Sequence, residues 1–81
     1  MSRDDRTASL RAADHANVWH PFTPMSVWLG DDAPIIERGE GSFLIDTEGT
    51  RYIDGISSLW VNVHGHSHPR IVDAIAEQAK R

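Results

Sequence analysis

The sequence predicts an α+β fold in which a three-stranded antiparallel meander is followed by a C-terminal helix. Three short runs with strand-forming residues, separated by glycine-containing turns, lie between residues 34 and 54. After Pro69, apolar residues recur with the 3.6-residue period of a helix. A chain of 81 residues is short for an independent domain, because such chains bury only about 60% of their unfolded surface.

The predicted strands are residues 34–41, 42–46 and 51–54, with turns at residues 47–50 and, before the first strand, at residues 30–34. Apolar and aromatic side chains on these runs form the predicted buried set, which is Ile36, Phe43, Ile45, Tyr52 and Ile53. The charged side chains between them form the predicted solvated set, which is Glu37, Arg38, Glu48 and Arg51.

The N-terminal region divides into a tail and a loop. Residues 1–16 are predicted to be a flexible tail, in which residues 8–14 either form a short helix or stay frayed, and residues 17–81 form the structured part. The loop, residues 15–25, is stiffened by Pro21 and Pro24, which prevent a helix or a central strand from persisting. Its Trp19 is interpreted as an anchor on a neighbouring core.

The C-terminal helix begins at Pro69, since proline is favoured at the first helical position. Ser67 or His68 would cap it. Its predicted packing face consists of Ile71, Val72, Ile75 and Ala79. No glycine, proline or cap follows the pattern, so the helix is expected to run to the last residue and the chain to be a piece of a longer protein.

Composition excludes several function classes. The net charge is −4, from 8 basic and 12 acidic residues, and the basic residues are scattered, so neither nucleic acid nor an anionic membrane is an expected partner. The chain has no cysteine, and therefore no disulfide framework or thiolate metal site. Without a secretory signal or an apolar run of about 20 residues, a cytoplasmic location is expected.

Turn-forming and hydrogen-bonding residues crowd into residues 53–70, IDGISSLWVNVHGHSHPR, which indicates a site. Asp54-Gly55 predicts a turn. Residues 59–64 alternate aliphatic with polar or aromatic side chains, which predicts an extended segment whose second face, with Trp60, contacts a ligand. The alternative for Trp60 is a buried anchor.

The histidines of this stretch, His64, His66 and His68, have three readings. On a strand, the H-x-H-x-H spacing would place three imidazoles on one face as zinc ligands. Gly65 and Pro69 break such a strand, however, and no further ligand cluster lies nearby. We therefore predict no metal site, and expect either hydrogen bonds to the loop backbone or a contribution to the architecture of a cofactor site.

Two blocks resemble the class III (ω-type) pyridoxal-phosphate aminotransferases. The residues D-G-I-S-S-L-W-V-N-V-H-G-H-S-H-P resemble the N-terminal part of that family, and V-W-H-P-F-T-P-M at residues 18–25 resembles its preceding block. The form S-S-L-W-V-N-V-H-G-H is most similar to members that act in biotin synthesis. The resemblance covers residues 17–81 and implies the N-terminal small-domain segment of an α/β, fold-type I transferase.

The resemblance also implies a site and an activity. Phe22, Ser58, Leu59 and Trp60 would form a substrate-side wall, with Phe22 where the family often has tyrosine and Leu59 where some members have a second tryptophan. The enzyme would move an amino group from S-adenosylmethionine to 8-amino-7-oxononanoate, giving 7,8-diaminononanoate. The alternatives are another class III enzyme, such as an ω-amino acid:pyruvate transaminase, and a small binding module.

The chemistry itself is expected outside these residues. Pyridoxal-phosphate catalysis needs a lysine that binds the cofactor covalently, and the only lysine is Lys80, in the terminal helix. The resemblance places the catalytic lysine, the phosphate cradle and the aspartate at the pyridine nitrogen in a large domain that follows. No catalytic residue is therefore predicted in this chain, which alone would be inactive, and the complete enzyme would be a homodimer.

Overall fold

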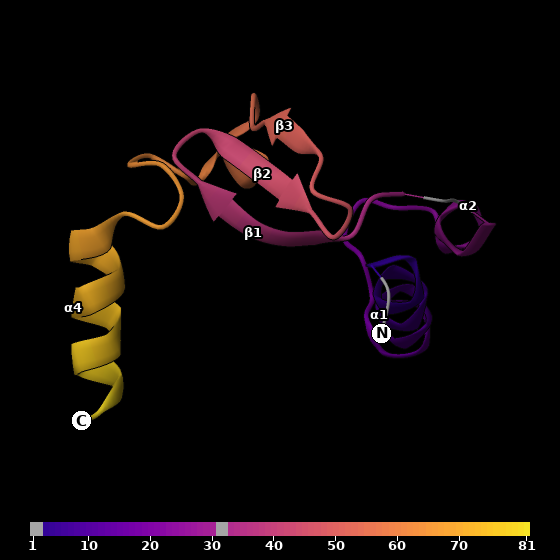
Figure 1. Cartoon of the computed structure of the whole chain (residues 1–81), viewed down its shortest axis with the longest axis horizontal. Coiled ribbons are helices and arrows are strands. Elements are labelled where there is room, and N and C mark those ends of the chain that lie inside the picture. The colour runs from indigo at the N-terminus through magenta and orange to yellow at the C-terminus, as the bar shows by residue number, and fades with distance from the viewer. Residues whose placement is uncertain (1–2, 31–32) are drawn as a thin grey trace.

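The computed structural model describes residues 3–30 and 33–81. In chain order the elements are α1 (Arg3–Asn17), α2 (Met25–Gly30), β1 (Ile36–Glu40), β2 (Phe43–Asp46), β3 (Arg51–Ile53), α3 (Ser57–Trp60) and α4 (Pro69–Ala79). The sheet lies in the middle, with α1 and α2 toward one end and α4 toward the other (Figure 1). The turn predicted at residues 30–34 falls partly outside the described residues, because it includes residues 31 and 32.

The predicted meander is confirmed. β1 pairs with β2 and β2 with β3, both antiparallel, in the order β1-β2-β3. Leu44 of β2 lies opposite Gly39 on one side and Tyr52 on the other, and a bulge between Ile36 and Arg38 shifts the register of β1. The α+β arrangement predicted for this piece, a meander followed by a C-terminal helix, is therefore present.

The turn between β2 and β3 is organised by one carboxylate. Asp46 accepts hydrogen bonds from the backbone N–H groups of Glu48 and Thr50, both at 2.9 Å, and from the Tyr52 hydroxyl, also at 2.9 Å. Burial acts to raise the pKa of Asp46, but these hydrogen bonds outweigh it and lower the pKa below the ordinary aspartate value. The same bond to Asp46 raises the pKa of Tyr52.

The predicted buried set is largely wrong. Ile45 is 2% exposed, and Phe43 is half-buried, but Ile36, Tyr52 and Ile53 are exposed. The radius of gyration is 14.9 Å, against about 12 Å for a compact chain of this length. The sheet therefore has one well-buried aliphatic side chain and apolar faces that nothing in the described part of the chain covers. The predicted exposure of Glu37, Arg38, Glu48 and Arg51 is confirmed.

Residues 3–16, predicted to be a tail, belong to the helix α1, which docks on the β2–β3 turn. The Oγ1 atom of Thr7, a buried residue, lies 2.6 Å from Oγ1 of Thr47 and donates to Glu48 Oε1 at 2.6 Å. Arg3 donates to the Glu48 carbonyl at 2.7 Å. The short-helix alternative therefore holds over a longer range than expected, while the domain boundary at residue 17 stays a prediction.

The helix α4 begins as predicted. Pro69 is its first residue, and Nδ1 of the cap His68 accepts from the Arg70 N–H at 3.3 Å. It ends at Ala79 rather than at the last residue. Its predicted packing face is exposed throughout: Ile71, Val72, Ile75 and Ala79.

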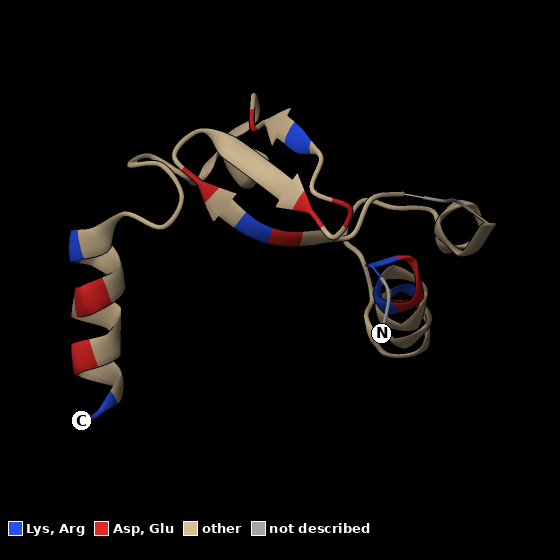
Figure 2. Cartoon of the chain, viewed as in Figure 1, with Lys and Arg blue, Asp and Glu red and all other residues tan. Residues whose placement is uncertain are grey.

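Two surface properties bear on partners. Charges of both signs are interspersed over α1, the sheet and α4 rather than gathered by sign (Figure 2). Within the described residues, no helix has the length and apolarity needed to cross a membrane.

Candidate functional site

The stretch singled out by the sequence contains a turn of unusual handedness. Ser57, Ser58, Leu59 and Trp60 have φ angles of 52°, 47°, 70° and 72°, so α3 is a left-handed turn and the extended segment predicted for residues 59–64 is wrong. Left-handed helical backbone costs roughly 1–2 kcal/mol per non-glycine residue, because Cβ approaches the following carbonyl oxygen. A run of four such residues without glycine therefore requires specific stabilising contacts.

The Asp54 carboxylate supplies those contacts. Its Oδ1 accepts from the Ser58 N–H at 2.8 Å, and its Oδ2 accepts from the Ser58 hydroxyl at 2.8 Å. The side chain is only 4% exposed, and its own N–H donates to the Ser42 carbonyl at 2.8 Å. Asp54 thus ties the left-handed turn to the start of β2.

His66 completes the arrangement from the following loop. Its Nε2 donates to Asp54 Oδ2 at 2.7 Å. Its backbone pairs with that of Gly41: the His66 N–H donates to the Gly41 carbonyl at 2.7 Å, and the Gly41 N–H donates to the His66 carbonyl at 3.2 Å. The ring lies against Gly39, where an added Cβ would be 2.6 Å from His66 Cγ. The adjacent Ser67 donates its hydroxyl to the Gly39 carbonyl at 2.6 Å. The ring is therefore held from both its backbone and its face.

These bonds shift the titration of Asp54. The backbone and hydroxyl bonds from Ser58 lower the pKa of Asp54 below the ordinary aspartate value and outweigh burial, which acts to raise it, and the bond from His66 adds a smaller lowering effect. A depressed folded-state pKa gives stability that is present above the unfolded pKa and is lost as the pH falls through the folded pKa.

We expect the full-length protein to lose this contribution in acid, below about pH 4. The carboxyl carbon of Asp54, followed by NMR in the selectively labelled protein, should titrate below the ordinary aspartate range, and it should titrate higher in an S58A variant, which lacks one donor. An Asp54 that titrates at or above the ordinary value would contradict the observed bonding.

A second carboxylate fixes the loop that carries Phe22. Asp14, near the end of α1, accepts from His20 Nε2 at 2.8 Å and from Trp28 Nε1 at 3.0 Å. The rings of His20 and Trp28 lie 4.3 Å apart between centroids. Residues 18–24 are irregular, as predicted, but the loop is shorter than the predicted range 15–25, because residues 15–17 belong to α1 and Met25 begins α2, a helix that the sequence did not predict. Phe22 has a φ of 55° and is 92% exposed.

The four predicted wall residues occupy two elements. Ser58, Leu59 and Trp60 follow one another on α3, whereas Phe22 lies on the α1–α2 loop. Trp60 is 80% exposed and Trp19 is 85% exposed, so the reading of either as a buried anchor is wrong for this chain. The shared role of Phe22 and the α3 turn as one wall stays a prediction.

The histidines do not assemble as zinc ligands would. His66 turns to Asp54, while the His64 and His68 rings meet edge-on with centroids 6.4 Å apart. In residues 3–30 and 33–81 there is no group of three potential ligand side chains. His68 bonds a backbone group, as expected, because its Nδ1 accepts from the Arg70 N–H at the start of α4. The His66 ring instead bonds the side chain of Asp54, so the expected ring-to-backbone bond is wrong for this histidine.

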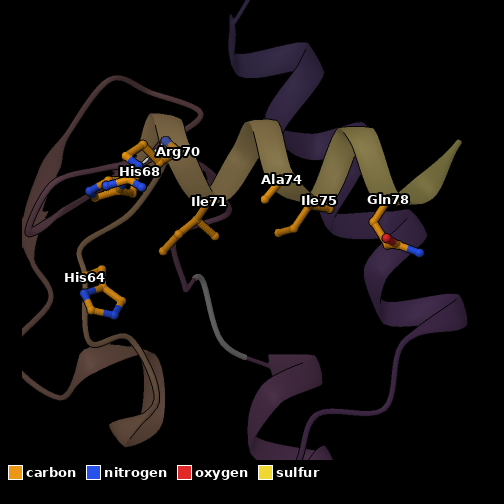
Figure 3. A pocket seen from close by; sticks show the side chains of 7 residues that line it. All are labelled: His64, His68, Arg70, Ile71, Ala74, Ile75 and Gln78. Carbon is orange, nitrogen blue, oxygen red and sulfur yellow. Dashed lines mark hydrogen bonds between the residues drawn. The ribbon is translucent and has the colours of Figure 1, made fainter.

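A hollow of about 580 Å³ runs along α4. Figure 3 shows Ile71, Ala74 and Ile75 on the helix side that faces it, with His64 across from them and Gln78 at the far end. Of the four residues predicted to form the packing face, Ile71 and Ile75 line this open groove, whereas Val72 and Ala79 do not.

Residues 27–81 match the family described as Aminotransferase class-III. The chain belongs to this family. The family and the fold implied by the sequence motifs are thus confirmed, and the matched residues include the sheet, the left-handed turn and α4.

Several relatives carry one name, adenosylmethionine-8-amino-7-oxononanoate aminotransferase. The protein from Nitratidesulfovibrio vulgaris is 58% identical over 76 residues, covering 94% of this chain and 14% of that protein. The one from Staphylococcus aureus is 48% identical over 75 residues, covering 93% and 17%. The chain thus spans about a seventh to a sixth of the length of these relatives.

Two solved transaminase structures also resemble this chain. The crystal structure of the enzyme of that name from Methanocaldococcus jannaschii matches with a TM-score of 0.82 and 44% identity, over 90% of this chain and 17% of that one. An (S)-enantioselective omega-transaminase from Thermomicrobium roseum matches with a TM-score of 0.82 and 36% identity, over 91% and 17%.

Sequence reasoning missed three residues that hold the site, which are Asp14, Asp54 and His66. From the sequence, Asp54 indicates only a turn, and His66 is one of three closely spaced histidines with His64 and His68. The sequence signal for this contact is an Asp-Gly turn followed by a Gly-His loop about twelve residues later. Polar groups that become buried between two such loops need hydrogen-bond partners, and each loop can supply them to the other.

Proposed function

We propose that this chain is the N-terminal part of the small domain of a pyridoxal-phosphate enzyme that transfers an amino group from S-adenosylmethionine to 8-amino-7-oxononanoate, giving 7,8-diaminononanoate for biotin synthesis. The observation that carries this proposal is the identity of 58% and 48% to the proteins from Nitratidesulfovibrio vulgaris and Staphylococcus aureus, both named adenosylmethionine-8-amino-7-oxononanoate aminotransferase. Structures described as omega-transaminases are less similar, at 36% and 32%.

Within that enzyme, the chain contributes the substrate-side wall formed by Phe22, Ser58, Leu59 and Trp60. Two structural features support this role. The aromatic side chains are exposed and therefore available to a ligand, and the segments that carry them are held by hydrogen bonds to the carboxylates of Asp54 and Asp14. Exposed aromatics on a rigid support bind an apolar substrate chain at little entropic cost.

The cofactor does not fit the residues of this chain. Lys80 is the one lysine in the sequence, and its side chain is 72% exposed and paired with Glu77 at 3.4 Å, at the end of α4. An exposed amine of this kind lacks the desolvated surroundings that activate a lysine nucleophile. Pyridoxal phosphate, which carries the amino group between the two substrates, is therefore assigned to the large domain.

Three further features belong to the same proposal. The enzyme is a cytoplasmic homodimer, and small molecules rather than nucleic acid or membrane are its partners. The exposed faces of α4 and the sheet support assembly with further protein, because contiguous apolar surface of this kind is rare on monomeric proteins.

The second candidate function is that of an ω-amino acid:pyruvate transaminase, favoured by the structural match to the Thermomicrobium roseum enzyme.

The test is an assay of the full-length protein loaded with pyridoxal phosphate. With S-adenosylmethionine as donor and 8-amino-7-oxononanoate as acceptor, we expect 7,8-diaminononanoate at a kcat/KM at least about tenfold above that for an ω-amino acid with pyruvate. The reverse ranking would replace the first function by the second. No transfer with either pair would overturn both.

A further inference from the structure

We propose that Asp54 is a positioning residue for the substrate wall: together with His66, it holds the turn Ser57–Trp60 in the left-handed conformation that presents Leu59 and Trp60 to substrate. This inference rests on the proposed function, since it gives the proposed wall its support. It concerns a residue that does not itself contact the substrate.

The first step is conformational. All four residues of the turn have positive φ, and none is glycine, so their own preferences oppose the observed backbone. The turn also makes backbone bonds of its own, from Trp60 N–H to the Ile56 carbonyl at 2.6 Å and from Val61 N–H to the Ser57 carbonyl at 3.0 Å. The bonds that attach it to the rest of the fold at Ser58 come from Asp54.

The second step is rigidity. A clamp positions a turn only if the clamp is itself fixed, and Asp54 is anchored to Ser42 through its N–H and to His66 through its carboxylate. His66 is fixed in turn by its backbone pair with Gly41 and by contact with Gly39. The turn is therefore connected through Asp54 and His66 to the β1–β2 hairpin.

The third step connects backbone to binding. Trp60 follows Ser58 by two residues, so a change of backbone at Ser58 redirects the indole as a whole. Releasing the turn would spread Leu59 and Trp60 over many orientations, and substrate binding would then have to select one of them. The expected signature is weaker substrate binding with little change in the chemical step.

The experiment uses the full-length holoenzyme and the steady-state kinetics of 8-amino-7-oxononanoate. D54A is expected to raise KM about tenfold while kcat stays within about twofold. In a W60A background the same substitution is expected to change KM less than about twofold, because the side chain that it positions is gone. A merely structural defect would lower the active fraction, and hence kcat, in both backgrounds.

A rescue variant adds a second readout. Glycine adopts the left-handed region without strain. The double variant D54A/S58G should therefore have a KM below that of D54A and closer to that of the unsubstituted enzyme. If D54A does not fold, D54N replaces it, because the amide keeps one oxygen to accept from the Ser58 N–H. For D54N we expect a rise in KM of about threefold that again disappears in the W60A background.

The outcomes separate the two proposals. If W60A alone leaves KM unchanged, the substrate wall of the proposed function is wrong. If W60A raises KM, the wall is supported. The positioning role of Asp54 is then overturned by either of two results: the Asp54 substitution alone leaves KM unchanged, or it raises KM by the same factor with and without W60A. Non-additive effects with rescue by S58G support the positioning role.

Discussion

Replacing Gly39 with alanine is expected to destabilise the full-length protein by about 1–3 kcal/mol, the usual cost of overpacking, and to break the hydrogen bond between His66 and Asp54. The new Cβ would lie 2.6 Å from Cγ and 2.7 Å from Cβ of His66, distances that real Cβ atoms do not show. Because the clash reaches the root of the side chain, rotation of the ring alone cannot relieve it. His66 must move and leave Asp54, or the strand must shift.

The matched control is G55A, which adds the same methyl group beside Asp54, where no atom lies within 4 Å. Thermal unfolding of both variants, with hydrogen exchange of the peptides that cover residues 36–46 and 53–68, should show a large effect for G39A alone. The exchange increase should concentrate in residues 53–68. A G39A protein as stable as G55A would contradict the packing of His66 on β1.

The parts of the fold that sequence reasoning predicted are those set by local rules. Gly-containing turns between short strand-forming runs give the meander, and Pro69 with an apolar 3.6-residue period gives α4. Burial was not predictable in the same way. Ile53 and the α4 face are apolar but exposed here, since a local apolar pattern does not determine whether another element packs against it.

The left-handed turn illustrates the other limit. Alternation over residues 59–64 favoured an extended segment, but the conformation of Ser58 is decided by Asp54, a buried carboxylate whose second partner is twelve residues away. Such a tertiary contact overrides local preference. Ser58, Leu59 and Trp60 come together only because they are adjacent in sequence, whereas Phe22 depends on contacts of Asp14 that carried no recognisable pattern.

Removing the Trp60 indole is the second large effect that we expect. The side chain is 80% exposed in this chain, so it is free to contact a substrate and its loss removes little packing from the segment. If about 50–100 Å² of the indole contacts the substrate, its removal weakens binding by about 1–2 kcal/mol, or about five- to thirtyfold. Because this contact exists before and after the chemical step, the loss should fall on KM.

Trp19 offers the matched comparison, because it is an equally large side chain that is 85% exposed and lies outside the predicted wall. The most direct measurement is therefore the KM of the full-length holoenzyme for 8-amino-7-oxononanoate in W60A and in W19A. We predict a five- to thirtyfold rise for W60A and a change below about twofold for W19A. Equal effects of the two substitutions, or an unchanged KM in W60A, would show that the left-handed turn forms no wall of the substrate pocket.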